Sequence, residues 1–146
     1  MVTLLFCAAC NQAQQARTNV AAATTNLGPV PTPAAADLTK VEKSKEEWQA
    51  ELTSQEFYVL RQKGTERAFS GDLWDNKARG IYTCAGCELP LFSSDTKYRS
   101  GTGWPSYYAP IDEAYIAEEE ELQYGWNRVE VLCARCDGHL GHVFED

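Results

Sequence analysis

Two Cys-x-x-Cys pairs, Cys84-Ala85-Gly86-Cys87 and Cys133-Ala134-Arg135-Cys136, decide the fold of this chain. Each pair brings two sulfurs to one side of a tight turn, and two such turns supply the four thiolates of a tetrahedral zinc site. Because 45 residues separate the pairs, we expect the metal to join two distant hairpins. With all four ligands supplied by the protein, the site has no open position and is structural.

The same cysteines have two other interpretations, as dithiol redox motifs or as disulfides. A single pair would not decide between them, but two pairs favour zinc. One tightly held zinc per chain would eliminate a protein that uses its dithiols directly in redox chemistry. A structural zinc of this kind contributes on the order of 10 kcal/mol to folding, which matters in a small domain.

The composition divides the chain of 146 residues near Val41. Residues 11–43 are rich in Ala, Thr and Pro and predict a disordered linker. Residues 44–146 predict one domain. The chain has 21 acidic and 13 basic residues, a net charge of −8, which argues against a nucleic-acid partner. We expect a monomer.

Residues 1–10, which end in Cys7-Ala8-Ala9-Cys10, resemble the end of a bacterial lipoprotein signal with Cys10 as the acylated residue. The match lacks a basic n-region, and Cys7 stands where an aliphatic residue is usual. A mis-set start codon or a disordered N-terminus are the alternatives. The signal predicts a periplasmic lipoprotein anchored only by its N-terminal lipid; without it the protein is expected in the cytoplasm. No later apolar run is long enough to span a bilayer.

Two capping boxes predict two short helices, near residues 45–52 and 54–63. Ser44 is followed three positions later by Glu47, and Thr53 by Glu56. Gly64 is a natural residue to end the second helix. We expect the apolar faces of both helices to pack on a sheet.

Beyond Gly64, turn residues separate short β-rich runs. We expect strands near 80–83, 89–92, 115–122 and 128–132, with the acidic run 118–121 near a turn or sheet edge. The prediction is a mainly β fold: a small zinc-stapled domain of antiparallel sheets with short N-terminal helices.

Trp104, His139 and His142 are the candidate recognition residues. Trp104 lies in a Gly- and Pro-containing turn and would contact an apolar or methylated group, although a Trp in a small domain is more often part of the core. The two histidines, three residues apart, would hydrogen-bond a polar substrate oxygen or donate a proton to it. A second metal site or a solvent-facing pair are the alternatives.

An ordered set of motifs makes a family resemblance specific. The chain reads, in order, Phe69-Ser70-Gly71, Gly80-Ile81-Tyr82-Thr83-Cys84, Leu89-Pro90-Leu91-Phe92, Lys97-Tyr98-Arg99-Ser100-Gly101, Gly103-Trp104-Pro105-Ser106, Arg128-Val129-Glu130-Val131, Cys133 to Cys136, and Gly138-His139-Leu140-Gly141-His142-Val143-Phe144. Residues 44–146 resemble peptide-methionine (R)-S-oxide reductase, the B class of methionine sulfoxide reductases.

The resemblance implies two antiparallel sheets and a structural zinc on Cys84, Cys87, Cys133 and Cys136. It implies that Trp104 holds the S-methyl end of the substrate and that His139 and His142 orient or protonate the sulfoxide oxygen. The implied reaction reduces methionine-(R)-sulfoxide in oxidised proteins: a cysteine thiolate attacks sulfur, methionine leaves, and a sulfenic acid remains. Thioredoxin or a similar dithiol then restores the thiol.

The chain departs from the family at the nucleophile. The family's Arg-Tyr-Cys-x-Asn-like segment lies downstream of the histidine motif and has no counterpart before Asp146, so we expect the nucleophilic Cys beyond residue 146. Thr102 stands where some members carry a resolving cysteine. We therefore expect a C-terminally truncated reductase without turnover in this form. The alternative function is a zinc-binding, non-catalytic recognition module or a pseudoenzyme.

Overall fold

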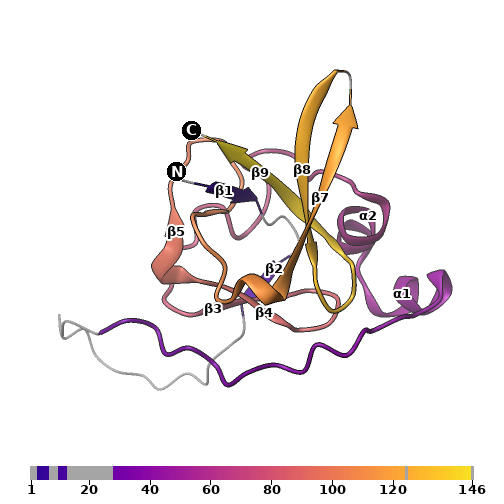
Figure 1. The fold of residues 1–146 in the computed structure, drawn as a ribbon, viewed down its shortest axis with the longest axis horizontal. Helices are drawn as coiled ribbons and strands as arrows, with labels where there is room; N and C mark the ends of the chain where they lie inside the picture. The colour runs from indigo at the N-terminus through magenta and orange to yellow at the C-terminus, as the bar shows by residue number, and fades with distance from the viewer. Residues whose placement is uncertain (1–2, 7–9, 13–27, 124, 146) are drawn as a thin grey trace.

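A computed structural model describes residues 3–6, 10–12, 28–123 and 125–145 of this chain. It contains two helices and nine strands among these residues, with the helices beside one end of a twisted sheet (Figure 1). The fold is mainly β, with antiparallel pairing throughout the described strands. The prediction of a mainly β domain with short helices is therefore confirmed. Among the described residues no helix is long and apolar enough to cross a membrane.

The two helices form where the capping boxes predict them. Helix α1 spans Lys45–Glu51 and helix α2 spans Ser54–Gln62, each with both hydrogen bonds of its box present. The end of α2 differs slightly from the prediction, because Lys63 and not Gly64 takes the left-handed conformation, with φ of 55°. Lys63 thereby leaves the helix axis, and this places its side chain over the large sheet, where it enters the candidate site.

The strands form two sheets. The larger has the order β5-β6-β1-β9-β8-β7, and the smaller has the order β2-β3-β4. The acidic run 118–121 lies on β7 at an edge of the larger sheet, as expected. The bounds are β1 Thr3–Phe6, β2 Cys10–Gln12, β3 Ile81–Cys84, β4 Pro90–Ser93, β5 Lys97–Tyr98, β6 Ser106–Tyr107, β7 Ile116–Gln123, β8 Trp126–Cys133 and β9 His139–Glu145, with 3₁₀ turns η1 Ser94–Thr96 and η2 Glu113–Tyr115.

Aromatic side chains join the two sheets. Phe92 of β4 stacks on Tyr107 of β6 with ring centroids 4.4 Å apart, and Tyr82 of β3 meets the same ring edge-on at 5.2 Å. All three are fully buried. Such contacts add to the free energy gained by burying the rings, so they fix the small sheet, and with it the first Cys-x-x-Cys turn, against the large one.

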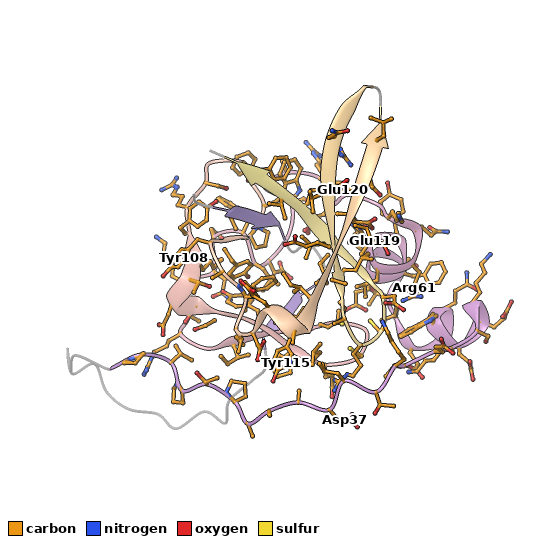
Figure 2. All side chains as sticks on the ribbon, in the orientation of Figure 1. Asp37, Arg61, Tyr108, Tyr115, Glu119 and Glu120 are labelled. Atoms are coloured by element: carbon orange, nitrogen blue, oxygen red, sulfur yellow. The ribbon has the colours of Figure 1, made fainter. Side chains whose placement is uncertain are left out.

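Residues 28–43 differ from the expected disordered linker. They run extended along the domain (Figure 1), where the backbone N–H of Ala36 donates to the hydroxyl of Tyr115 at 2.9 Å and that of Val41 donates to Arg135 O at 2.8 Å. Figure 2 labels Tyr115 beside this segment and Asp37 within it. We call residues 28–43 the strap. In the rest of the expected linker, residues 11–12 belong to β2, and residues 13–27 lie outside the described residues.

The N-terminal segment contributes a strand to the larger sheet. β1 lies between β6 and β9, and Leu5 pairs with Tyr107 on one side and with Val143 on the other. β2 adds to the smaller sheet with Cys10 opposite Cys84. The lipoprotein signal and the export that it implies stay predictions, and residues 1–2 and 7–9 lie outside the described part.

Candidate functional site

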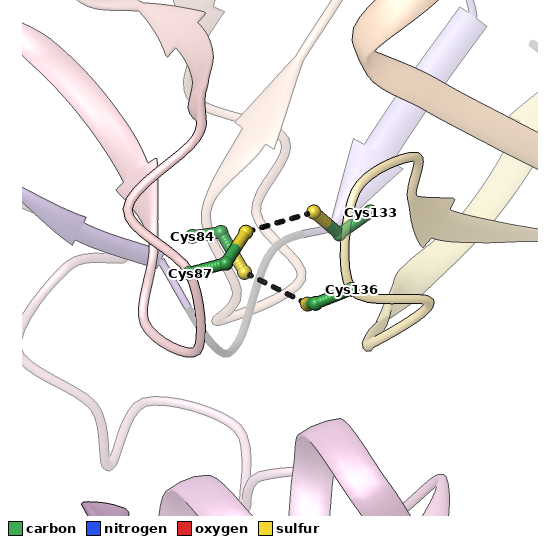
Figure 3. Close-up of side chains that lie close together, drawn as sticks. All are labelled: Cys84, Cys87, Cys133 and Cys136. Carbon is green, nitrogen blue, oxygen red and sulfur yellow. Dashed lines mark hydrogen bonds between the residues drawn. The ribbon is translucent and has the colours of Figure 1, made fainter. Parts of the chain in front are cut away.

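The four cysteines of the two pairs converge on one point. Their sulfurs all lie within 4.8 Å of one another, with Cys84 and Cys136 3.7 Å apart and Cys87 and Cys133 3.5 Å apart (Figure 3). Metal–sulfur bonds of about 2.3 Å in a tetrahedron put the sulfurs about 3.8 Å apart. The donor set therefore fits a four-thiolate metal ion, as the spacing in the sequence predicts.

Two hairpin turns of matching geometry hold these sulfurs. β3 ends at Cys84 and β8 ends at Cys133, and after each the chain turns back so that Glu88 N–H donates to Cys84 O at 2.8 Å and Asp137 N–H to Cys133 O at 2.9 Å. Glu88 and Asp137 both take the left-handed conformation, with φ of 63° and 59°. The metal site thus joins two hairpins that are distant in sequence, which confirms that expectation.

The electrostatics of the cluster favour a bound cation. Hydrogen bonding, first of all with Cys133, lowers the pKa of the Cys87 thiol and raises the pKa of the Cys84 thiol. Four thiols at these distances cannot all ionise without a counter-charge, because like charges disfavour one another. A divalent cation at the centre takes up all four thiolates at once. The four cysteines therefore fit a metal ion whose coordination positions would all be filled by sulfur.

Both predicted histidines lie on β9 and face each other. The ring centroids of His139 and His142 are 5.3 Å apart, and the two ring planes are inclined at 64° to each other. A bulge in the β8–β9 pairing lies between them, where the register shifts between Val131 and Leu132. A bulge re-aims side chains locally, and here it brings two residues three positions apart to one place on the sheet.

His139 is almost completely buried against a carboxylate. Its Nδ1 lies 2.6 Å from Oε1 of Glu130, and the other carboxylate oxygen accepts from Lys63 Nζ at 2.8 Å. Glu130 has no exposed side-chain surface, whereas Lys63 is 57% exposed. The hydrogen bond to Glu130 raises the pKa of Lys63, so the lysine is a charged partner for the buried carboxylate.

His142 lies between a cation and an anion. Its Nε2 is 2.7 Å from the guanidinium Nη2 of Arg128 and 3.2 Å from Oε2 of Glu121. Burial is the main cause that lowers the pKa of His142, and Arg128 adds to it. Hydrogen bonds, first with Glu130 and then with His142 and Lys63, lower the pKa of Glu121 to about 2. At neutral pH His142 is therefore uncharged, although its neighbours Arg128 and Glu121 are both charged.

Trp104 is held by the loop that follows α2. Its indole Nε1 donates to the backbone oxygen of Glu66 at 2.6 Å, and the backbone N–H of Phe69 donates to Gly103 O at 2.9 Å. The indole is partly exposed, so it does not belong to the fully buried core. Phe69 is 57% exposed beside it, and the loop and turn together present an apolar surface.

The structure does not place Trp104 on a strand next to the histidines. Trp104 lies in the turn two residues before the start of β6, and β1 separates β6 from β9. The pairing of Leu5 with both Tyr107 and Val143 puts these three side chains on one face of the sheet. Ser106 and His142 each precede one of these residues in their strands, so they lie on the opposite face, two strands apart. β6 and β9 are therefore two strand spacings, about 10 Å, apart, and β1 lies between them.

The sequence pattern did not indicate the charged residues that contact the two histidines. Polar–apolar alternation on β8 assigns Arg128 and Glu130 to a solvent-facing side, yet Glu130 is buried. Its partner Lys63 is 67 residues distant. The one available signal is that Glu130 lies in the same strand as the second cysteine pair, close in sequence to the histidine motif.

Comparison with known proteins places this geometry in a family. A model of the SelR domain matches residues 52–146. The peptide methionine sulfoxide reductase MsrB of Methanosarcina barkeri is 59% identical over 106 residues, which cover 73% of this chain and 75% of that protein. MsrB of Leptospira interrogans is 51% identical over 107 residues, covering 73% and 82%.

The fold and the family match define a mainly β oxidoreductase domain with a four-cysteine cluster that fits a metal ion. Methanosarcina mazei MsrB, 58% identical over 107 residues, agrees with the two relatives above. This chain belongs to the SelR-domain family of peptide methionine sulfoxide reductases of the MsrB type. The resemblance that the motifs indicate is thereby confirmed.

Proposed function

We propose that this chain forms the substrate-binding framework for the reduction of methionine-(R)-sulfoxide in oxidised proteins to methionine. The observation that carries the proposal is the facing pair His139 and His142 on β9, in a chain of the MsrB family. Oxidised methionine-containing proteins are the corresponding partners. The metal cluster lies at the end of β8, outside the part of the site that would bind substrate.

The chemistry of a sulfoxide suits the residues in this region. Its oxygen is a strong hydrogen-bond acceptor, and its S-methyl group is apolar. His139 and His142 would meet the oxygen, and the partly exposed indole of Trp104 would contact the methyl group. Glu130 is bonded to Nδ1 of His139, and Arg128 and Glu121 are bonded to Nε2 of His142. These charged groups would hold both imidazoles in a fixed orientation toward the substrate.

The reaction requires an attacking thiolate, and we propose that it is none of the four clustered cysteines. Cys84, Cys87, Cys133 and Cys136 form the cysteine cluster that fits a metal ion, and Cys10 lies on β2 in the other sheet from the histidines. Attack of the thiolate on the sulfoxide sulfur forms a sulfur–sulfur bond while the oxygen takes a proton. Transfer of the hydroxyl to the cysteine sulfur then yields a sulfenic acid and methionine, a two-electron oxidation of cysteine that balances the two-electron reduction of the sulfoxide.

A dithiol completes the cycle. One thiol condenses with the sulfenic acid to release water and form a disulfide, and the second thiol reduces that disulfide. A thioredoxin-like protein is the proposed reductant. The proposed metal is Zn²⁺, because a four-thiolate tetrahedral donor set is typical of structural zinc. It would hold the β3–β4 and β8–β9 hairpins together without entering the reaction.

The test uses the 146-residue chain with the R and S epimers of N-acetyl-methionine sulfoxide. We expect chemical-shift changes at His139, His142 and Trp104 with the R epimer only, and no turnover with dithiothreitol. Trp104→Leu should lose this binding, and Tyr108→Leu, at an aromatic side chain that is 50% exposed, is the control. Equal binding of the two epimers would refute the recognition role. Robust turnover by the 146-residue chain would show that one of its own cysteines supplies the attacking thiolate.

A further inference from the structure

Glu130 is the one buried carboxylate among the residues that the structure describes. An ionised carboxylate removed from water costs several kcal/mol unless it is paired and hydrogen-bonded. Residues of this kind are seldom buried without partners. Its position in the middle of β8, opposite His142 in the β-ladder, therefore calls for a physical explanation.

Each oxygen of Glu130 has its own donor. Oε1 lies 2.6 Å from Nδ1 of His139, and Oε2 accepts from Lys63 Nζ at 2.8 Å. Lys63 is aimed at this point by its left-handed conformation at the end of α2. The two partners are contributed by different elements, β9 and α2, so the carboxylate is fixed from two sides.

The contact determines which nitrogen of His139 carries a proton. An ionised carboxylate can only accept hydrogen bonds, so Nδ1 of His139 must be the donor. The neutral ring then has its lone pair on Nε2, and any further proton that the ring takes up or gives away is exchanged at Nε2. His139 has one defined reactive atom as a consequence.

We propose that Glu130, supported by Lys63, is a positioning residue that holds His139 as the Nδ1–H tautomer and presents Nε2 to the sulfoxide oxygen. This inference rests on the proposed function for the identity of the substrate, but not for the tautomer. Glu130 does not touch the substrate and acts only through the imidazole. Carboxylate partners orient histidines in the same manner in other sites.

A purely structural ion pair would give a different result. If Glu130 only stabilised the fold, its replacement would lower the free energy of unfolding without changing the proton distribution on a His139 ring that still packs in place. A positioning role changes that distribution. The isosteric Glu130→Gln is the decisive variant, because its amide offers either an oxygen or an NH₂ group to Nδ1.

The measurement is ¹⁵N NMR of the imidazole rings in the metal-loaded 146-residue chain, at a pH where they are neutral. We expect the Nδ1–H tautomer at His139 in the unchanged chain and a mixture of both tautomers in Glu130→Gln. Glu120→Gln, at an exposed position on β7, is the control and should leave His139 unchanged. An Nε2–H tautomer in the unchanged chain, or the same tautomer in Glu130→Gln, would overturn the proposal. If the variant does not fold, the unchanged chain still decides it.

Titration with N-acetyl-methionine-(R)-sulfoxide separates this inference from the proposed function. We expect Glu130→Gln to weaken binding by about fivefold, the loss of roughly one hydrogen bond, with the metal content unchanged. If the R epimer binds to neither form while the tautomers behave as expected, the proposed substrate is wrong and the positioning role of Glu130 stands. Unchanged affinity together with an unchanged tautomer would refute the positioning role.

Discussion

Arg128 and His142 share a short hydrogen bond, 2.7 Å from the guanidinium Nη2 to the imidazole Nε2. A guanidinium can only donate, so Nε2 must accept, which requires a neutral ring with its proton on Nδ1. Oε2 of Glu121 lies 3.2 Å from the same Nε2. A hydrogen bond to this carboxylate requires a proton on Nε2, because an ionised carboxylate can only accept. One nitrogen cannot satisfy both partners, so protonation of His142 exchanges its bond to Arg128 for one to Glu121.

Replacing Arg128 by Met should raise the pKa of His142. Burial is the larger cause of the lowered pKa and remains, but the repulsion between Arg128 and the imidazolium is lost. The ring Cε1 proton, followed by NMR against pH, measures the shift. Arg99→Met, at an exposed arginine elsewhere, is the control. A pKa of His142 that stays the same or falls in Arg128→Met would contradict the exchange of partners.

Glu121 should stabilise the fold at neutral pH and lose this effect in acid. Its pKa is lowered from 4.5 to about 2 in the folded chain, so the unfolded chain binds the proton more readily and stability falls as the pH drops from about 4.5 toward 2. Because the side chain is partly open to solvent, we expect Glu121→Gln to reduce the free energy of unfolding by only about 1 kcal/mol at pH 6.

Urea unfolding at a series of pH values tests the contribution of Glu121. The difference between the unchanged chain and Glu121→Gln should shrink to zero as the pH approaches 2. Glu119→Gln is the matched control on the same strand, because Glu119 is exposed. A difference between the unchanged chain and Glu121→Gln that grows in acid would show that the carboxylate is not stabilised in its charged form.

Local signals in the sequence predicted the elements that depend only on near neighbours. The box of Ser44 and Glu47 lies within one turn, and both of its hydrogen bonds are present. The cysteine pairs are equally local, and four ligands of one kind meeting at one metal leave few arrangements. This is why the helices and the metal cluster follow closely from the sequence.

Long-range contacts decide the features that the sequence did not indicate. The strap has a composition typical of a tether, but Tyr115 and Arg135, 79 and 98 positions from the residues they hold, tie it to the domain. Glu130 is buried because Lys63 and His139 surround it. No pattern of period 2 or 3.6 carries information about such partners.

Replacing a metal ligand should unfold the domain. Cys133→Ser removes one of four sulfurs, and the loss of a structural metal forfeits on the order of 10 kcal/mol, comparable with the whole stability of a domain. We expect metal content well below one per chain by elemental analysis and loss of the folded circular-dichroism signal. Cys10→Ser should keep one metal per chain. Loss of the metal in Cys10→Ser together with a retained metal in Cys133→Ser would show that the four-sulfur site is wrong.

Arg135 should be more important to the strap than Lys40. Arg135 donates to the backbone oxygen of Asp37 at 3.0 Å and also to that of Cys87, so Arg135→Met leaves two carbonyls without that partner and should cost about 1–2 kcal/mol. Lys40→Met breaks only an exposed ion pair with Asp137 and should cost under about 0.5 kcal/mol. Limited proteolysis should cut the strap faster in Arg135→Met alone. Equal rates in the two variants would show that Arg135 does not hold the strap.

A methyl group at Gly103 should disturb the Trp104 turn far more than one at Gly101. Both glycines have positive φ, 87° and 78°, so alanine at either position adds backbone strain of about 1 kcal/mol. At Gly103 the added carbon would also lie 2.7 Å from the ring of Phe69 and 2.8 Å from its backbone nitrogen, whereas at Gly101 it would meet nothing within 4 Å. Phe69 cannot simply rotate away, because its own N–H is bonded to Gly103 O.

Gly103→Ala should therefore lower the free energy of unfolding by about 2–4 kcal/mol and weaken binding of the R-sulfoxide, while Gly101→Ala shows only the backbone strain. Equal losses of stability in urea for the two variants would mean that the turn does not depend on its contact with Phe69.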